Sequence, residues 1–207
     1  MPSPVTLYSA SFTTGALLRE ETLAVLALLQ QVPVDEVAAV AKKDAGSLKI
    51  NSEVARQKIA AEIVKRYKAV SPAVWDFFQT LTDEQHQQLV LFYVCLKTYR
   101  LIYDFMFAVV VPRWQSRLLP LSRSDFERYL DELALQHAPI QRLTEKTRRK
   151  LAQIVMLMMK QAQLIQHNQL STPAAPAYIW RFFQELGDDW MLDAGLLTHA
   201  DRQRLGL

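Results

Sequence analysis

The sequence is poor in the residues that build disulfide frameworks, phosphate-binding loops and β-rich folds. Its 207 residues include five glycines and a single cysteine, Cys95. One cysteine excludes an intramolecular disulfide and a zinc site made of several thiolates, and we interpret Cys95 as a small buried apolar residue. So few glycines argue against a glycine-rich phosphate loop and against the turn-dense texture of an all-β protein.

The sequence also lacks a long uninterrupted apolar run. Its most apolar stretch, residues 89–111, is interrupted by Lys97, Arg100 and Asp104, whereas a membrane-spanning helix needs about 20 predominantly apolar residues. We therefore interpret this stretch as one central buried helix of a soluble domain. The N-terminal segment MPSPVTLYSASF has no basic region followed by an apolar region, so it is not a secretory signal. These features predict a cytoplasmic protein with no membrane partner.

No familiar catalytic or metal-binding motif is present. The four histidines are scattered without an HExxH pattern, and there is no GxSxG nucleophile elbow. The one tight acidic group, Asp188, Asp189 and Asp193, follows a glycine and is better explained by an acidic turn or a helix start than by a metal site. The sequence therefore predicts that the protein is not an enzyme and carries no metal or other cofactor.

The composition of the sequence favours helices throughout the chain. Half of the residues are hydrophobic and 22% are charged, which fits a compact all-α protein built either as a single domain over residues 1–207 or as two lobes, residues 1–120 and 121–207. The predicted helix starts are Asn51 or Ser52, Thr82 with Gln85, Ser124 with Glu127, and Thr144, and the predicted stops include Pro112 and Pro139. We see no internal repeat.

Residues 143–165, LTEKTRRKLAQIVMLMMKQAQLI, combine a basic start with an apolar body. If this segment is a helix, its apolar side chains form one broad face, which we expect to pack into the core. This face comprises Leu151, Ile154, Val155, Met158, Ala162 and Ile165. The opposite stripe comprises Lys146, Arg149, Gln153 and Lys160. Residues 142–150 hold five cations and one acid, although cations are less favourable at a helix start than at a helix end. The negative charges of a nucleic-acid phosphate backbone would compensate these cations.

A second basic segment covers residues 49–68. Its outward cations are Lys58, Lys65 and Lys68, while Arg56 lies toward the apolar side, as either an ion-paired residue at the core edge or a reaching contact. Six cations against two acids give this window a charge of +4, which is also the charge of residues 142–150. Because the whole chain is only +3, the remainder carries −5. Two such clusters indicate nucleic-acid binding, and two ordinary solvated helix faces are the alternative.

Three segments carry a resemblance to a known family. YSASFTTGALLREETLAVLALL, NSEVARQKIAAEIVKRY and LTEKTRRKLAQIVMLMMKQAQLI resemble the BrxA family of bacteriophage exclusion (BREX) systems, over residues 8 to about 200. The resemblance implies an all-helical fold similar to the NusB antitermination factor, a role in phage defence, and double-stranded DNA binding without catalysis.

The family's helix starts match Ser52 to Arg56 and Thr144 to Arg149. After the last long helix, the family often has an acidic residue, a glycine and paired leucines. This chain has only Gln163, Leu164 and Ile165 at that place. The departure leaves open whether the chain has a winged-helix-like ending.

Three functional hypotheses are consistent with these features. The first is a DNA-binding accessory protein that contacts the duplex phosphate backbone with little sequence specificity. The second is an adaptor that meets acidic surfaces of other BREX components, and the third is a NusB-like module that binds RNA and regulates transcription. The aromatic residues lie away from both basic windows, which favours duplex contacts over base stacking. The predicted nucleic-acid contacts are Arg56, Lys58, Lys65, Lys68, Arg142, Lys146, Arg148, Arg149 and Lys150.

Overall fold

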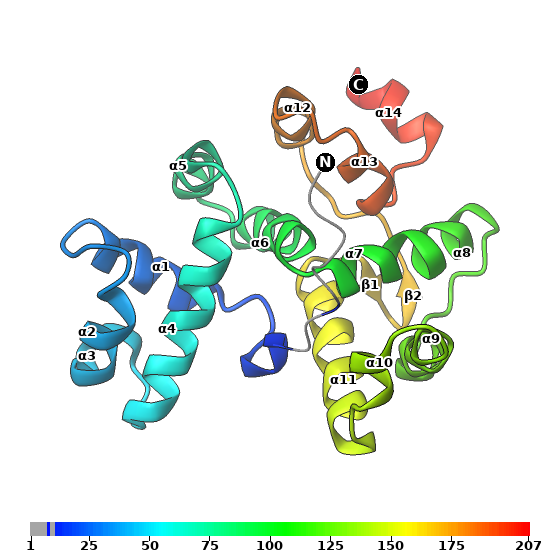
Figure 1. Cartoon of the computed structure of the whole chain (residues 1–207). Coiled ribbons are helices and arrows are strands. Elements are labelled where there is room, and N and C mark those ends of the chain that lie inside the picture. The colour runs from blue at the N-terminus through cyan, green and yellow to red at the C-terminus, as the bar shows by residue number, and fades with distance from the viewer. Residues whose placement is uncertain (1–7, 9–10) are drawn as a thin grey trace.

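The computed structural model describes residue 8 and residues 11–207, and it confirms the all-α fold class (Figure 1). In this part of the chain, the only strands form a two-stranded sheet with two residues in each strand. Residues 1–7, 9 and 10, which include most of the segment judged not to be a secretory signal, lie outside the described residues. Within the described ranges, no helix combines the length and the apolar character that crossing a membrane requires.

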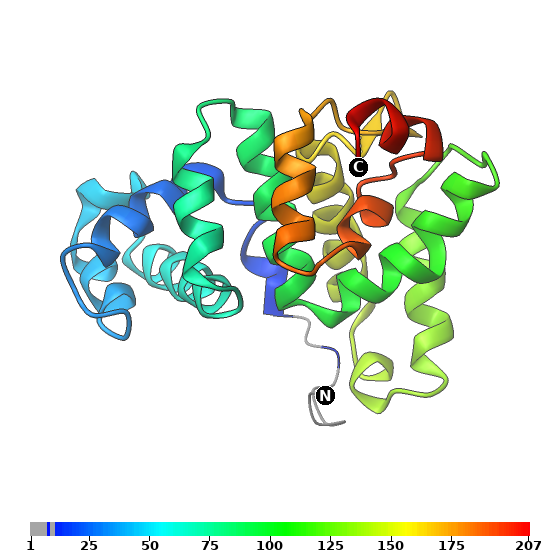
Figure 2. The ribbon, with the colours of Figure 1, turned by 90° about the horizontal axis from the view of Figure 1, so that it is seen from above.

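The chain begins with a helical lobe around a small hydrophobic core. A short 3₁₀ helix, η1 (Ser11–Thr14), precedes α1 (Arg19–Leu29), α2 (Val37–Lys43), α3 (Ala45–Leu48) and α4 (Glu53–Lys68). The core of this lobe consists of Val25, Leu28, Val37, Ala41, Leu48, Ala60 and Ile63. Figure 2 shows the lobe projecting from one side of a larger body. The larger hydrophobic cluster includes Phe12, Ala16, Leu17 and Leu26 as well as residues after α5 (Pro72–Thr80) begins. The choice between a single domain and two lobes stays a prediction.

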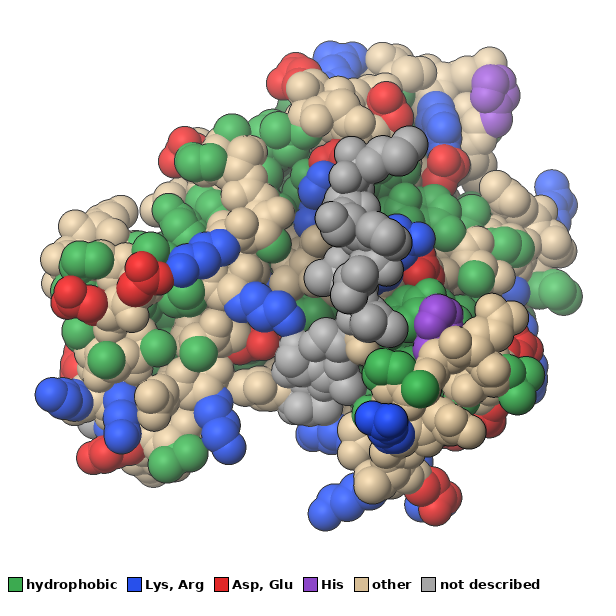
Figure 3. Space-filling view, viewed as in Figure 1, with side chains coloured by type: hydrophobic (Ala, Val, Ile, Leu, Met, Phe, Trp, Pro, Cys, Tyr) green, Lys and Arg blue, Asp and Glu red, His purple; other side chains and the backbone are tan. Residues whose placement is uncertain are grey.

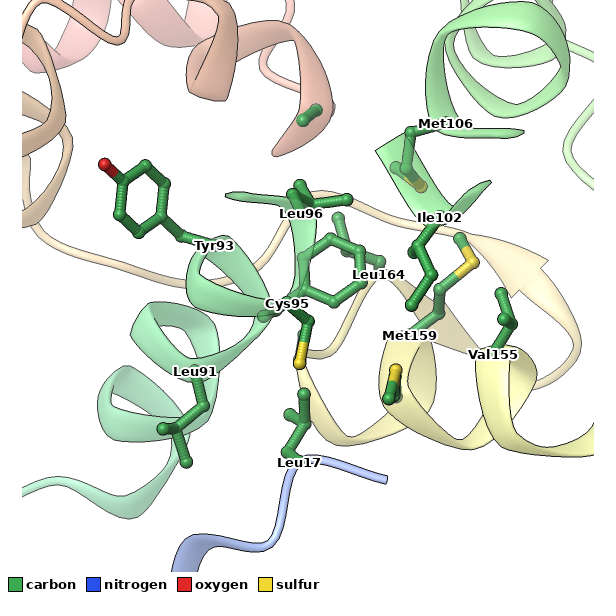
Figure 4. Packing of buried hydrophobic residues seen from close by; sticks show 14 of the residues in the cluster. Leu17, Leu91, Tyr93, Cys95, Leu96, Ile102, Met106, Val155, Met159 and Leu164 are labelled. Carbon is green, nitrogen blue, oxygen red and sulfur yellow. The ribbon is translucent and has the colours of Figure 1, made fainter. Parts of the chain in front are cut away.

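The larger body is built around α6. Its helices are α5 (Pro72–Thr80), α6 (Glu84–Thr98), α7 (Arg100–Phe105), the π-helical turn η2 (Met106–Val110), α8 (Val111–Gln115), α9 (Arg123–Ala134), α10 (Ala138–Gln141), α11 (Glu145–Gln161), α12 (Ala177–Glu185), α13 (Trp190–Ala194) and α14 (His199–Leu205). Every residue from 89 to 96 in α6 is buried. Cys95 is among them, near Leu17 (Figure 4), and this burial confirms its interpretation as a small apolar core residue.

The prediction of one long helix over residues 89–111 is wrong. α6 ends at Thr98, Tyr99 has an extended backbone (φ −122°, ψ 101°), and α7 begins at the next residue. The Tyr99 side chain is buried against α4, where its hydroxyl donates to Glu62 and accepts a 3.2 Å hydrogen bond from Arg66 Nε. These two partners are distant in sequence, so the break could not be seen locally.

Pro112 does not end the helix either. It lies in the first turn of α8, directly after η2. Because proline has no N–H to donate, the regular i−4 pattern is interrupted there, and the Val111 N–H just before it bonds to the Met106 carbonyl with π-helical spacing. In the same way, Pro139 lies in the first turn of α10, while α9 has already ended at Ala134.

The predicted helix caps are partly correct. Ser52 and Thr144 cap α4 and α11 as expected. The other two starts are displaced: the observed caps are Asp83 in place of Thr82 for α6, and Ser122 with Asp125 in place of Ser124 with Glu127 for α9. In both cases an aspartate accepts backbone N–H bonds, and its charge also complements the positive end of the helix dipole.

A small β-hairpin follows α11, which ends at Gln161 and not at Ile165. β1 (Ile165–Gln166) pairs antiparallel with β2 (Gln169–Leu170). The two turn residues, His167 and Asn168, have φ of 50° and 61°, as a two-residue hairpin turn requires. The Leu170 N–H donates to the Leu119 carbonyl at 2.7 Å, which places the segment before α9 alongside β2. A two-stranded hairpin thus follows α9, α10 and α11, and α12 to α14 come after it. The winged-helix-like ending stays an open question of the sequence.

Candidate nucleic-acid interface

Two helix–turn–helix units share one local plan. In each unit, a helix and a short helical turn lead into a long helix: α2, α3 and α4 in the N-terminal lobe, and α9, α10 and α11 in the larger body (Figure 1). Residues 52–63 read SEVARQKIAAEI, and residues 144–155 read TEKTRRKLAQIV. Both segments match Ser/Thr-Glu-x-x-Arg-x-Lys-Ile/Leu-Ala-x-x-Ile/Val. The expectation of no internal repeat is therefore wrong, because a short repeat marks the two helix starts.

Matching positions of the repeat have matching structural roles. The Ser52 hydroxyl accepts a hydrogen bond from the Ala55 N–H at 3.3 Å, and the Thr144 hydroxyl accepts one from the Thr147 N–H at 3.2 Å. Each cap satisfies one of the backbone donors left free at a helix start. The repeated alanines, Ala60 and Ala152, are fully buried in their respective units. The similarity of sequence is thus also a similarity of local structure.

Arg56 lies inside the N-terminal unit. Its side chain is 3% exposed, and its guanidinium donates to the carbonyls of Ala41, Lys42, Ile50 and Asn51 at 2.6–3.2 Å. These bonds fasten the end of α2 and the turn before α4 to the first turns of α4. The prediction that Arg56 contacts nucleic acid is corrected, because its donors are buried and already bonded to the main chain.

Arg148 is the equivalent residue of the second unit. Its Nε donates to the Leu143 carbonyl at 3.3 Å and its Nη2 to the Ile140 carbonyl at 3.2 Å. Its Nη1 forms a 2.5 Å ion pair with Asp131 of α9, and the side chain is 18% exposed. One of the cations at the start of α11 is therefore compensated within the protein, and Arg148 chiefly holds its own unit together.

The remaining cations at the two helix starts are on the surface. They are Lys58 on α4 and Arg142, Lys146, Arg149 and Lys150 at the start of α11. Arg149 is 70% exposed and pairs with Glu145 on its own helix. Across the described part of the chain, the side chains of the other four make no ion pair or hydrogen bond. They are available to an external anion.

Lys65 and Lys68 belong to the other end of α4. At 1.5 Å per residue, Lys68 lies about 15 Å along the helix from Lys58. The Lys65 ammonium lies 4.5 Å from the centre of the Tyr99 ring, and Lys68 forms a 2.6 Å ion pair with Asp35. Both side chains are exposed, but they are separate from the cations at the helix starts.

The two helix starts lie toward the same edge of the molecule. In Figure 1 the N-terminal ends of α4 and α11 both point to the lower edge of the view, and η1 packs against both helices. Figure 3 shows Lys and Arg side chains along this edge, over the N-terminal lobe and at the lower end of α11. The nine predicted contacts therefore do not form one patch, but their exposed members at the helix starts lie along one side.

The outer face of α11 continues from its basic start. Gln153 and Lys160 are exposed, as the polar stripe predicted for this helix requires, and Leu157 between them is exposed as well. They line a groove together with Arg123 at the start of α9 and Asn168 at the hairpin turn. An amide, an apolar side chain and cations along one helix face are the groups that contact base edges and phosphates in a DNA groove. The hairpin was not predicted from the sequence, because its turn residues, His167 and Asn168, include no glycine.

A comparison with models of known protein families identifies the family of this chain. A model of the BrxA family matches residues 6–185. The chain belongs to the BrxA family. It is therefore associated with BREX phage defence. Both helix–turn–helix units of this BrxA-family chain lie within the matched region, whereas α13 and α14 lie beyond it.

One solved structure has a similar fold. It is described as an uncharacterized protein from Magnetospirillum magneticum, and its crystal structure is 18% identical to this chain with a TM-score of 0.73. The match covers 92% of this BrxA-family chain and 99% of the other chain. At this identity the likeness shows the fold alone. No curated protein matches the sequence, and the expected likeness to NusB stays a prediction.

Asp188, the first member of the acidic group, is held by hydrogen bonds within the protein. Asp188 accepts hydrogen bonds from the Tyr93 hydroxyl at 2.5 Å, from Trp190 Nε1 at 2.7 Å and from Lys97 Nζ at 3.0 Å. Burial acts to raise the pKa of Asp188, but these three donors together hold its pKa below the ordinary value. Asp188 thus ties the C-terminal helices of this BrxA-family chain to α6. Among the described residues, no three His, Cys, Asp or Glu side chains are grouped so that they could hold a metal ion.

Proposed function

We propose that this BrxA-family chain is a non-enzymatic, double-stranded DNA-binding accessory protein of a BREX system. The observation that supports this proposal is the pair of similar helix–turn–helix units, each presenting exposed cations at the start of its long helix. Arg56 and Arg148 hold the two units rigid, so Lys58, Lys146 and Lys150 extend from fixed positions. The backbone N–H groups of the first turns add further donors for phosphate oxygens.

The composition of the exposed surface favours contacts with the phosphate backbone. Five exposed cations at the helix starts outnumber the groups suited to reading bases, of which Gln153 is the clearest on α11. Contacts to phosphates fix the position of a protein on the duplex but carry no sequence information. We therefore expect binding with little sequence specificity.

The placement of aromatic residues favours duplex over single-stranded nucleic acid. Proteins that bind single strands stack bases on exposed aromatic rings among cations. The most exposed large aromatic side chain described is Tyr178, and it lies on α12, outside the two helix–turn–helix units. The two basic helix starts offer charge without a stacking platform.

The test is a titration of fluorescent DNA duplexes with the purified protein at several salt concentrations, alongside duplex RNA of matched sequence. If the five exposed cations each neutralise one phosphate, the slope of log affinity against log salt is about −4.5. We expect equal affinities for unrelated DNA duplexes. Absence of binding at low salt would overturn the proposal and favour the adaptor hypothesis. Tighter binding to RNA would favour the NusB-like hypothesis.

A further inference from the structure

A pocket distinct from the proposed interface lies between α8 and the C-terminal helices. It holds about 660 Å³, and Val111, Leu119 and Leu197 contribute apolar walls. This volume is in the range of about 300–1,000 Å³ that small-molecule sites occupy. None of the nine predicted nucleic-acid contacts lines it. Part of its lining comes from residues 193–202, which lie beyond the region matched by the family model.

Two arginines give the pocket spare donors. Arg117 is exposed, and its side chain has no ion pair or hydrogen bond within the part of the chain that the structure describes. Arg202 bonds to Asp193 Oδ1 through Nη2 at 2.5 Å. The other nitrogens of Arg202 have no partner among the described residues, and its Nε is buried. An anion that accepted hydrogen bonds from Arg117 and from Nη1 of Arg202 would satisfy donors that the protein itself leaves unused.

Trp114 adds an aromatic wall and another unused donor. The other three tryptophans donate their indole N–H to the Tyr67 carbonyl, the Ala175 carbonyl and the Asp188 carboxylate. The indole N–H of Trp114 has no such partner in the described ranges, although the ring is half-buried in the pocket. The ring therefore offers a flat apolar surface beside an N–H that can donate to a ligand.

The charges lining the pocket select for an anion. Asp193 is the one carboxylate among the lining residues, and Arg202 already neutralises it. Arg117 therefore leaves the lining with a net positive charge. We propose that this pocket binds a small organic anion with an aromatic or aliphatic body. The body packs against Trp114 and Leu197, and its carboxylate or phosphate accepts hydrogen bonds from Arg117 and Arg202.

The test uses two fluorescent probes that share one aromatic body. 8-Anilinonaphthalene-1-sulfonate carries an anionic group that stands in for the carboxylate or phosphate, and N-phenyl-1-naphthylamine lacks it. We expect the full chain to bind the sulfonate at one saturable site, about tenfold tighter than the neutral probe. Arg117→Gln should weaken sulfonate binding by about tenfold, the effect of one charged hydrogen bond, and leave binding of the neutral probe unchanged.

A matched control separates the pocket from general attraction of an anion to a basic protein. Arg204→Gln removes the same charge from α14 at a residue that does not line the pocket, so it should leave sulfonate binding unchanged. Displacement of the probe by 1-naphthoate or by 1-naphthyl phosphate shows which anionic group is preferred, and either result supports the site. Displacement by neither, equal weakening by the two arginine variants, or no saturable binding would overturn the proposal.

Discussion

Arg56 and Arg148 each lie four residues after the hydroxyl that caps their helix, and each donates its guanidinium hydrogen bonds to carbonyls of the segment before that helix. The repeated arginine therefore fastens a long helix to the turn that precedes it. The repeated lysines two residues later, Lys58 and Lys150, are exposed. This separation of roles within one helix start distinguishes residues that build the unit from residues that are free to bind a ligand.

Arg56→Ala should lower the free energy of unfolding by roughly 2–4 kcal/mol, because four main-chain carbonyls lose a charged donor. Lys58→Ala, two residues away on the surface, should change it by less than about 0.5 kcal/mol. Urea denaturation followed by circular dichroism measures both. The effect on DNA affinity should be the reverse of the effect on stability: Lys58→Ala weakens DNA binding while the protein stays fully folded. Equal stability of the two variants would contradict the structural role of Arg56.

The double variant Lys146→Gln with Lys150→Gln should weaken duplex binding at least about tenfold at low salt. The salt slope should become shallower by about 2, because two phosphate contacts are lost. The control, Arg181→Gln with Arg204→Gln, removes the same charge from α12 and α14, which lie at the opposite edge from the start of α11 in Figure 1. If both double variants weaken binding equally, net charge explains the affinity and the proposed interface is wrong.

Tyr99→Phe should destabilise the protein by roughly 1–3 kcal/mol, since the buried polar groups of Glu62 and Arg66 each lose a hydrogen-bond partner. Tyr103→Phe is the matched control on the same stretch of chain, because the Tyr103 hydroxyl makes no hydrogen bond within the described residues. Thermal unfolding of both variants tests the idea. Identical melting temperatures for the two would show that the contact between α4 and Tyr99 contributes nothing to stability.

Asp188→Asn should lower the free energy of unfolding at pH 7 by roughly 1–2 kcal/mol, because three donors lose a charged acceptor. The pKa of Asp188 is lowered in the folded state relative to its ordinary value of 3.8. Its stabilisation is therefore present above that value and is lost as the pH falls through the folded pKa. The difference between wild type and variant should narrow below about pH 4. Asp189→Asn, at an exposed neighbour without a side-chain cap bond, should show neither effect in urea denaturation.

The sequence predicted the parts of the fold that depend on neighbours along one helix. In α11, the apolar positions Leu151, Ile154 and Val155 are buried and Gln153 and Lys160 are exposed, as helical periodicity required. Periodicity is a local property, because residues three and four apart share a face whatever packs against it. The candidate site was predictable to the same extent: the sequence located the two basic helix starts and their caps.

Contacts between segments that are distant in sequence determined the features of the fold that the sequence did not predict. The break at Tyr99 depends on Glu62 and Arg66 of α4, more than thirty residues earlier, and the hairpin after α11 depends on the segment around Leu119 that pairs with β2. A helical pattern cannot show such partners. The helical pattern also could not show which of two cations on one helix is buried. A guanidinium is buried only where backbone carbonyls from another element accept its hydrogen bonds. The sequence by itself therefore determined the helices and the charge at their starts. Only the tertiary structure separated Arg56, which is bonded to carbonyls of α2, from Lys58, which no other element covers.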